Sequence, residues 1–250
     1  MIELSGLTKR FGGLTAVKAL DLSVKPGEIF GFLGPNGAGK TTTVKLITGL
    51  LKPTEGRIVV SGRDVAREPL EAKRVMGLVP DEPFVYPKLT GAEYLRFIGE
   101  LYAVALAVQK RRIPELLAMF ELSDWGGELV ESYSHGMRQK LVLAGILLHE
   151  PKVLVLDEPL VGLDPKSARM AKDILKTLAE RGTCIFMCTH VLEIAEKLCD
   201  RVGIMISGSL IALGTIDELR RGARQDGSGL EDLFLSLTGG QEYSTLLKNL

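Results

Sequence analysis

Short apolar runs alternate with longer segments of helical periodicity along most of this chain. A run of four to six apolar residues, bounded by turn residues, is typical of a strand that is covered on both faces. Such runs occur at residues 29–33, 75–80, 153–156 and 183–188. Helical patterns separate them, and strands that alternate with helices favour a mainly parallel α/β sheet. We therefore predict the α/β fold class.

Between about residues 88 and 150 the spacing of the apolar residues changes to the period of an α-helix. Thr90 and Glu93 have the spacing of a capping box, and apolar residues follow them at helical intervals. Pro114 suits the first turn of a second helix, and a third helix is expected to begin near Ser134. We predict a helical insert between two β-rich parts.

Antiparallel structure is expected on either side of this insert. Residues 2–33 are predicted as strands, and Ser61-Gly62 and Ser207-Gly208 each have the composition of a hairpin turn. We predict one domain over 1–222 and a glycine-spaced C-terminal tail over 223–250, for which the pattern predicts no fold.

Composition narrows the class of protein. The 250 residues are 46% hydrophobic and 25% charged, which is typical of a globular protein. Acidic and basic residues number 31 each, and this balance argues against a nucleic-acid partner. No apolar run reaches the ~20 residues that span a bilayer, and the N-terminus does not resemble a signal peptide. We therefore expect a cytoplasmic location.

Residues 34–41 fit the pattern G-x-x-x-x-G-K-[ST], directly after an apolar strand and before a helix. In this context the glycines let several backbone N–H groups point to one place, and the helix N-terminus adds partial positive charge. The lysine supplies a full charge for phosphates, and the threonine hydroxyl is placed to bind Mg²⁺. We expect phosphate binding by Gly34, Pro35, Asn36, Gly37, Ala38, Gly39, Lys40, Thr41 and Thr42.

Asp157 and Glu158 end the apolar strand that starts at residue 153. The carboxyl ends of strands in such a sheet form the edge where ligands bind, and this edge also carries the phosphate loop. One carboxylate can hold a metal ion, and the next can accept a proton from an attacking water. We assign Asp157 to the metal and Glu158 to the general base.

Three further positions allow two interpretations from the residues alone. His190 follows the strand 183–188 and so lies at the same edge, but a structural histidine explains it as well. Ser134, with Gly136, opens a helix whose N-terminus is a possible anion site, although a simple N-cap is the more ordinary reading. Phe11 is either a core residue or an aromatic that stacks on a base.

The order of these motifs resembles the ATP-binding subunit of an ABC transporter over about residues 1–220. Residues 34–41 match its Walker A motif, 133–137 resemble its signature, and 153–158 match Walker B. Leu163-Asp164 match the D-loop and His190 the switch histidine. The resemblance implies a P-loop NTPase core with an antiparallel β subdomain and a helical insert of the ABC ATPase type.

The resemblance also implies ATP and Mg²⁺ as cofactors and Lys40, Glu158 and His190 as catalytic residues. Phe11 falls where the family stacks an aromatic on adenine. Asp81 stands where the family usually has glutamine, and as a carboxylate it could still bind Mg²⁺. Ser134 and Gly136 of one subunit would cap the phosphate held by Lys40 of a second ATPase subunit, in a homodimer or heterodimer.

A membrane partner follows from the same resemblance. The family docks an integral-membrane transporter subunit against the loop at residues 81–87, which would place this chain peripherally on the inner face of the cell membrane. The sequence Gly136-Met137-Arg138-Gln139-Lys140 and the tail ending in Leu230–Gly240 resemble those of subunits that are paired with drug, lipid or polysaccharide exporters. The alternative is a non-transport ABC ATPase of repair, translation or regulation, although these usually carry coiled coils or a second cassette.

Overall fold

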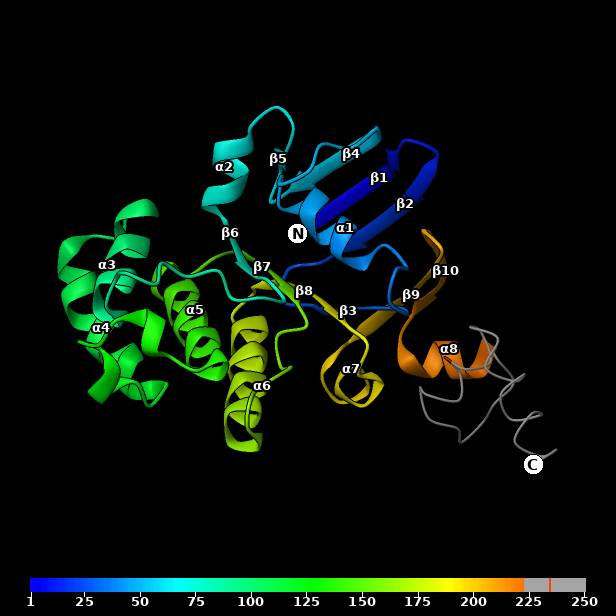
Figure 1. Ribbon diagram of the computed structural model, residues 1–250. Coiled ribbons are helices and arrows are strands. Elements are labelled where there is room, and N and C mark those ends of the chain that lie inside the picture. Colours follow the sequence, from blue (N-terminus) through cyan, green and yellow to red (C-terminus); the bar gives the residue numbers. More distant parts are fainter. Residues whose placement is uncertain (223–233, 235–250) are drawn as a thin grey trace.

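The computed structural model describes residues 1–222 and Phe234, so the rest of the predicted tail lies outside the described residues. Two sheets lie one above the other in Figure 1. The smaller sheet is antiparallel throughout, which agrees with the predicted hairpins. Its strand order is β2 (Leu14–Val24), β1 (Ile2–Phe11), β4 (Glu55–Val60) and β5 (Arg63–Asp64).

The larger sheet has six strands and is parallel except at one edge, where β9 and β10 form the predicted hairpin at Ser207-Gly208. The prediction of a mainly parallel sheet is confirmed. Its order is β10 (Ser209–Gly214), β9 (Arg201–Ile206), β3 (Ile29–Leu33), β8 (Cys184–Thr189), β7 (Val153–Asp157) and β6 (Met76–Val79).

The strands β3, β7 and β8 are buried on both faces, which explains why they are continuously apolar in sequence. Helix α1 (Lys40–Ile47) packs between the two sheets, and its apolar residues join one core cluster with Phe30, Phe32 and Phe186. Helices α6 (Pro165–Glu180) and α7 (Leu192–Leu198) lie on the opposite side in Figure 1. This layering holds the carboxyl ends of β3, β7 and β8 together at one edge.

The predicted helical insert forms a separate group of helices at the β6 end of the large sheet (Figure 1). Thr90 and Glu93 make the expected capping box at the start of the first helix, and Ser134 caps the third. The elements are α3 (Gly91–Leu101), α4 (Leu106–Met119), the 3₁₀ turns η1 (Ser123–Trp125) and η2 (Val130–Ser132), and α5 (His135–His149).

The predicted start of the second helix at Pro114 is wrong. Helix α4 begins at Leu106, so that Pro114 lies in its interior. A proline there removes one backbone hydrogen bond and crowds the preceding turn. Pro114 and Lys110, whose carbonyl loses its partner, both lie on the exposed face of the helix, while Ile113 and Leu116 on the buried face keep it packed.

Two short helices complete the described part. Helix α2 (Pro69–Arg74) connects β5 to β6 and was not predicted from the sequence, because its six residues are too few for a clear period. Helix α8 (Ile216–Gly222) follows the expected capping box of Thr215 and Glu218. None of the described helices is both long and apolar enough to cross a membrane.

Candidate functional site

The phosphate loop curls around the side chain of Lys40 at the carboxyl end of β3. The Lys40 Nζ atom donates to the carbonyl of Gly34 at 2.6 Å and to that of Pro35 at 3.1 Å. Only 7% of this lysine is exposed, so its charge is held inside the loop. The arrangement directs a positive charge and the N-terminus of α1 to the same place, as anion binding requires.

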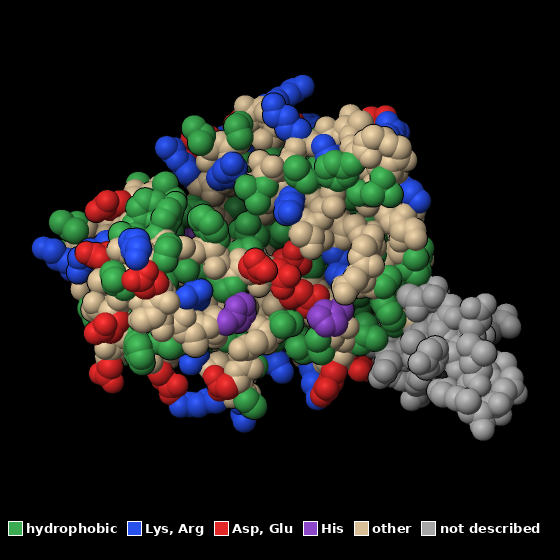
Figure 2. Space-filling model, in the orientation of Figure 1, with side chains coloured by type: hydrophobic (Ala, Val, Ile, Leu, Met, Phe, Trp, Pro, Cys, Tyr) green, Lys and Arg blue, Asp and Glu red, His purple; other side chains and the backbone are tan. Residues whose placement is uncertain are grey.

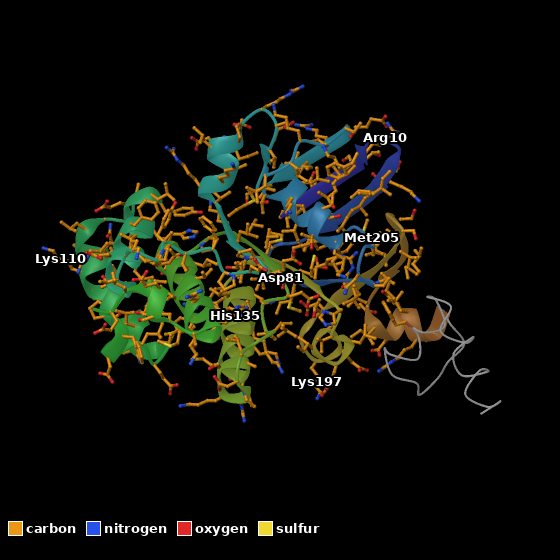
Figure 3. The ribbon with its side chains drawn as sticks, viewed as in Figure 1. Arg10, Asp81, Lys110, His135, Lys197 and Met205 are labelled. Atoms are coloured by element: carbon orange, nitrogen blue, oxygen red, sulfur yellow. The ribbon has the colours of Figure 1, made fainter. Side chains whose placement is uncertain are left out.

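Two glycines of this loop cannot be replaced without moving neighbouring backbone. A Cβ atom on Gly34 would lie 2.4 Å from the carbonyl oxygen of Met205, and one on Gly39 would lie 2.3 Å from that of Ala16. Gly39 also has a φ of +110°, a conformation that other residues rarely adopt. The glycine positions of the pattern therefore reflect close packing of β2 and β9 against the loop, with Met205 seen beside it in Figure 3.

A hollow of about 670 Å³ opens over the loop. Phe11, at the end of β1, lines it with 46% of its surface exposed, so the core interpretation of this residue is wrong. The other lining residues include the phosphate-loop members Asn36, Gly37, Gly39, Lys40, Thr41 and Thr42. Sequence reasoning missed the rest of the lining, which comes from the β2 residues Leu14, Thr15, Ala16 and Lys18 and from Gly13, Ser207 and Gly208.

Asp157 lies buried at the end of β7, next to the phosphate loop. The hydroxyl of Thr41 lies close to its carboxylate and favours the charged form. Burial raises the pKa of Asp157 above its usual value, and the nearby carboxylates of Asp81 and Glu158 raise it further. Asp81 lies centrally in Figure 3, and Figure 2 shows acidic side chains gathered in the middle of the same face. A cation near these groups would be favoured.

These oxygen ligands do not form a metal site by themselves. Among the described residues, no group of three or more His, Cys, Asp or Glu side chains could hold a metal ion. Magnesium is usually bound by one or two carboxylates together with phosphate oxygens of a substrate. Thr41 and Asp157 fit this donor set, since a hydroxyl and a carboxylate face the loop that would hold the phosphates.

Glu158 is held in place by the end of the neighbouring strand β8. The backbone N–H of His190 donates to its Oε1 at 2.9 Å, the Nδ1 of the same histidine lies 2.7 Å from Oε1, and the Thr189 hydroxyl donates to Oε2 at 3.0 Å. The backbone of Glu158 has a φ of +49°, a strained conformation for a residue with a side chain. The predicted pairing of Glu158 and His190 at one edge is confirmed, and Thr189 is a partner that sequence reasoning missed.

Ser134 and Gly136 lie outside this hollow. Ser134 caps α5 by accepting a hydrogen bond from Met137 N–H at 3.3 Å, and no residue of the helical insert lines the hollow. Gly136 instead faces the loop after Glu158, where a Cβ atom on it would lie 3.5 Å from the carbonyl oxygen of Gly162. The structure thus brings together Lys40, Asp157, Glu158 and His190, and leaves the α5 N-terminus turned toward another surface.

A buried hydrogen bond joins α5 to the loop that follows Glu158. The side chain of Gln139 is fully buried, and its Nε2 donates to the carbonyl of Pro159 at 2.7 Å. Pro159 directly follows Glu158, so the helix that Ser134 caps is bonded to the backbone beside the acidic pair. Sequence reasoning missed Gln139. Its position one turn into a helix that is otherwise apolar on its buried side was the available signal.

Comparison with known proteins defines the class. The ABC transporter family model matches residues 17–161, which is more than half of the chain. The fluoroquinolones export ATP-binding protein of Mycobacterium tuberculosis is 40% identical over 250 residues, covering 96% of this chain and 82% of its own. A solved structure described as an ATP-binding subunit of an ABC transporter has a TM-score of 0.92 at 33% identity, covering 95% of this chain and 99% of that one.

A second solved structure is a dimeric ATP-binding cassette in a post-hydrolysis state with ADP and Pi. It superposes with a TM-score of 0.79 at 27% identity and covers 86% of this chain and 98% of that one. The chain therefore belongs to the ABC transporter family of ATP-binding proteins. It is an ATPase subunit that powers transport, and the predicted ABC ATPase fold is confirmed.

Proposed function

We propose that this chain pairs with a second ATPase subunit, encloses Mg²⁺-ATP between the two, and drives export through a separate integral-membrane subunit. The direction of transport rests on likeness to a relative named for fluoroquinolone export. The pairing rests on the site itself, and a dimeric cassette among the similar structures agrees with it.

The observation that carries the proposal is that the phosphate hollow is incomplete within one chain. Its lining includes Lys40, the aromatic ring of Phe11 and three threonines, and all of the lining comes from residues 11–42 and 207–208. The N-terminus of α5, with the Ser134 hydroxyl and the small Gly136, is an anion-binding feature that faces elsewhere. A second subunit placed head to tail would bring its own α5 over this hollow.

The roles of the residues in that assembly follow from their placement. Lys40 would hold the β and γ phosphates and Phe11 would stack on adenine. Mg²⁺ would be held by Thr41, Asp157 and Asp81 together with phosphate oxygens. Its bound charge would offset the carboxylates that raise the Asp157 pKa.

Glu158 would accept the proton of the attacking water. The Nδ1–H of His190 donates to Glu158 and orients the carboxylate, and Nε2 would donate to the γ-phosphate only with a proton on both ring nitrogens. Both side chains stand on adjacent ends of β7 and β8, so this geometry needs no movement within the chain.

The surface for the membrane subunit is the loop at residues 81–87 with the neighbouring face of α3. Phe84 is 77% exposed and packs edge-on against Tyr86 at 5.9 Å, and Tyr86 packs likewise against Phe97 at 5.1 Å. An exposed row of three aromatic rings is unusual on a monomer and marks an interaction site.

Mixing two inactive variants tests the shared site. In a head-to-tail dimer, either Lys40→Ala or Ser134→Arg inactivates both ATP sites when both copies carry it. A mixed pair regains one site with an intact Lys40 and an intact Ser134. We expect ATP hydrolysis to return on mixing these two purified variants.

The matched control mixes Lys40→Ala with Glu158→Gln. These two residues belong to the same half of the site, so every site of the mixed pair stays defective and no activity should return. If the first mixture stays as inactive as the control, a site shared between two copies of this chain is wrong. Recovery of a different ATPase subunit with the native chain would then indicate a heterodimer.

Purification of the chain from detergent-solubilised membranes tests the transport assignment. We expect a polytopic membrane protein to copurify, and we expect the triple variant Phe84→Ser, Tyr86→Ser, Phe97→Ser to lose it while keeping its ATPase activity. An active dimer without a membrane partner would contradict the transporter assignment and favour a non-transport ABC ATPase.

A further inference from the structure

A second and larger cavity, of about 860 Å³, lies at the opposite edge of the large sheet from the phosphate loop. Residues just before β7 and β8 line it, among them Pro151 and Thr183, whereas Asp157 and His190 mark the other ends of these strands. Its volume falls in the range of small-molecule sites, roughly 300–1,000 Å³. Nothing in the ATPase chemistry described above uses it.

The walls of this cavity are mainly apolar. They come from the C-terminal ends of α4 and α5 and from one side of α6, where Met119, Leu147, Met170, Ile174 and Leu178 face it. All five remain at least partly exposed. An apolar ligand that binds there would remove this exposed aliphatic surface from water, which favours binding.

The charged residues at this cavity are predominantly basic. Five basic side chains line it against two acidic ones, although the whole chain carries no net charge. Arg112 pairs with Glu150 at 3.5 Å, and Lys166 pairs with Glu121. The other three, Lys152, Arg169 and Arg181, form no ion pair with any described residue.

We propose that this cavity binds a single-chain amphiphile with an anionic head, of the fatty-acid class. The aliphatic walls take the chain, and the cations at Lys152, Arg169 and Arg181 take the head group. Electrostatic complementarity is the feature that distinguishes this ligand from a neutral or cationic amphiphile of the same length.

The volume argues against a protein segment in this place. An α-helix with its side chains is about 10 Å across, so a space of this size would hold about 11 Å of it, or roughly seven residues. That is too short for a stable helical contact, whereas a flexible hydrocarbon chain fits an irregular cavity of this size.

Titration calorimetry of the full chain with hexadecanoate, below its critical micelle concentration, tests the proposal. We expect one site per chain. Each buried methylene contributes up to about a fourfold gain in affinity, so hexadecanoate should bind more than tenfold more tightly than dodecanoate. Hexadecyltrimethylammonium, with the same chain and the opposite charge, should bind more than tenfold more weakly.

Charge reversal locates the site. The double variant Arg169→Glu, Arg181→Glu should weaken hexadecanoate binding more than tenfold. Lys176→Glu is a matched control, because this exposed lysine is on the same helix but does not line the cavity. Lys40→Ala should bind hexadecanoate as the native chain does, which excludes seating of the head group at the phosphate loop.

Ile174→Trp fills the cavity without changing its charge and should also weaken binding, while its melting temperature reports whether it folds. The proposal is overturned if hexadecanoate shows no saturable binding, or if the charge-reversed double variant binds as tightly as Lys176→Glu. Loss of binding in Lys40→Ala would likewise refute it, since the fatty acid would then occupy the nucleotide site.

Discussion

The protonation of His149 should make the folded chain less stable in mild acid. This histidine ends α5, and its ring stacks on that of Tyr102 with 3.7 Å between the centroids and 7° between the planes. Its Nδ1 atom is buried with no hydrogen-bond partner. Burial lowers the pKa of His149 from 6.5 to about 4, because the charged ring would lose its hydration there.

The sign of the effect follows from proton binding. Between pH 6.5 and about 4 the unfolded chain binds a proton at this position and the folded chain does not, so the free energy of unfolding falls as the pH is lowered through this window. At pH 5 the loss is about 2 kcal/mol, which corresponds to about 4–8 °C in melting temperature for a chain of this size.

His149→Phe keeps an aromatic ring on Tyr102 and removes the titrating group. We expect its melting temperature, measured by calorimetry at pH 7 and pH 5 without nucleotide, to fall several degrees less between these pH values than that of the native chain. His135→Gln is the control, because His135 is exposed and should leave the native difference unchanged. An equal fall in His149→Phe and the native chain would refute the reasoning.

Three further substitutions test separate parts of the structure. Gln139→Leu leaves the Pro159 carbonyl without its donor, so the free energy of unfolding should fall by about 1–3 kcal/mol and ATPase activity should fall as well. An unchanged melting temperature and activity would contradict the role of this hydrogen bond. Asp81→Gln removes a negative charge beside the metal site and should keep or raise ATPase activity, with Glu82→Gln as the control; a large loss would show that the aspartate has a role of its own. Pro114→Ala restores a backbone donor inside α4 and should raise the melting temperature by a few degrees, and a lower melting temperature would show that the proline suits its turn.

Sequence reasoning succeeded where the chemistry depends on local spacing. The phosphate loop needs glycines at fixed positions before a helix, so its strand, loop and lysine could be placed from residues 29–47 alone. The same holds for the acidic pair, since Asp157 and Glu158 directly follow a short apolar run that is typical of a buried strand. Caps such as Thr90 with Glu93 were predictable because both partners lie within four residues.

The rest depended on contacts between distant parts of the chain. The hydroxyl of Thr189 at the end of β8 contacts Glu158 at the end of the neighbouring strand β7, and the pairing of these strands has no signal in either segment. The start of α4 was misplaced because Pro114 is locally unfavourable inside a helix, and packing of the buried face outweighed that cost. Such tertiary effects cannot be read from short-range propensity.

The hydrogen bond between Gln139 and Pro159 would couple the two ATP sites of a dimer. Helix α5 presents Ser134 and Gly136 at its N-terminus, and one turn later Gln139 holds the backbone next to Glu158. A movement of that backbone during hydrolysis at a chain's own site would therefore shift the helix that the same chain offers to the other site. Because this bond is buried and joins α5 directly to that backbone, we expect Gln139→Leu to lower the cooperativity of hydrolysis with respect to ATP as well as its rate. A lower rate with unchanged cooperativity would confine Gln139 to a structural role.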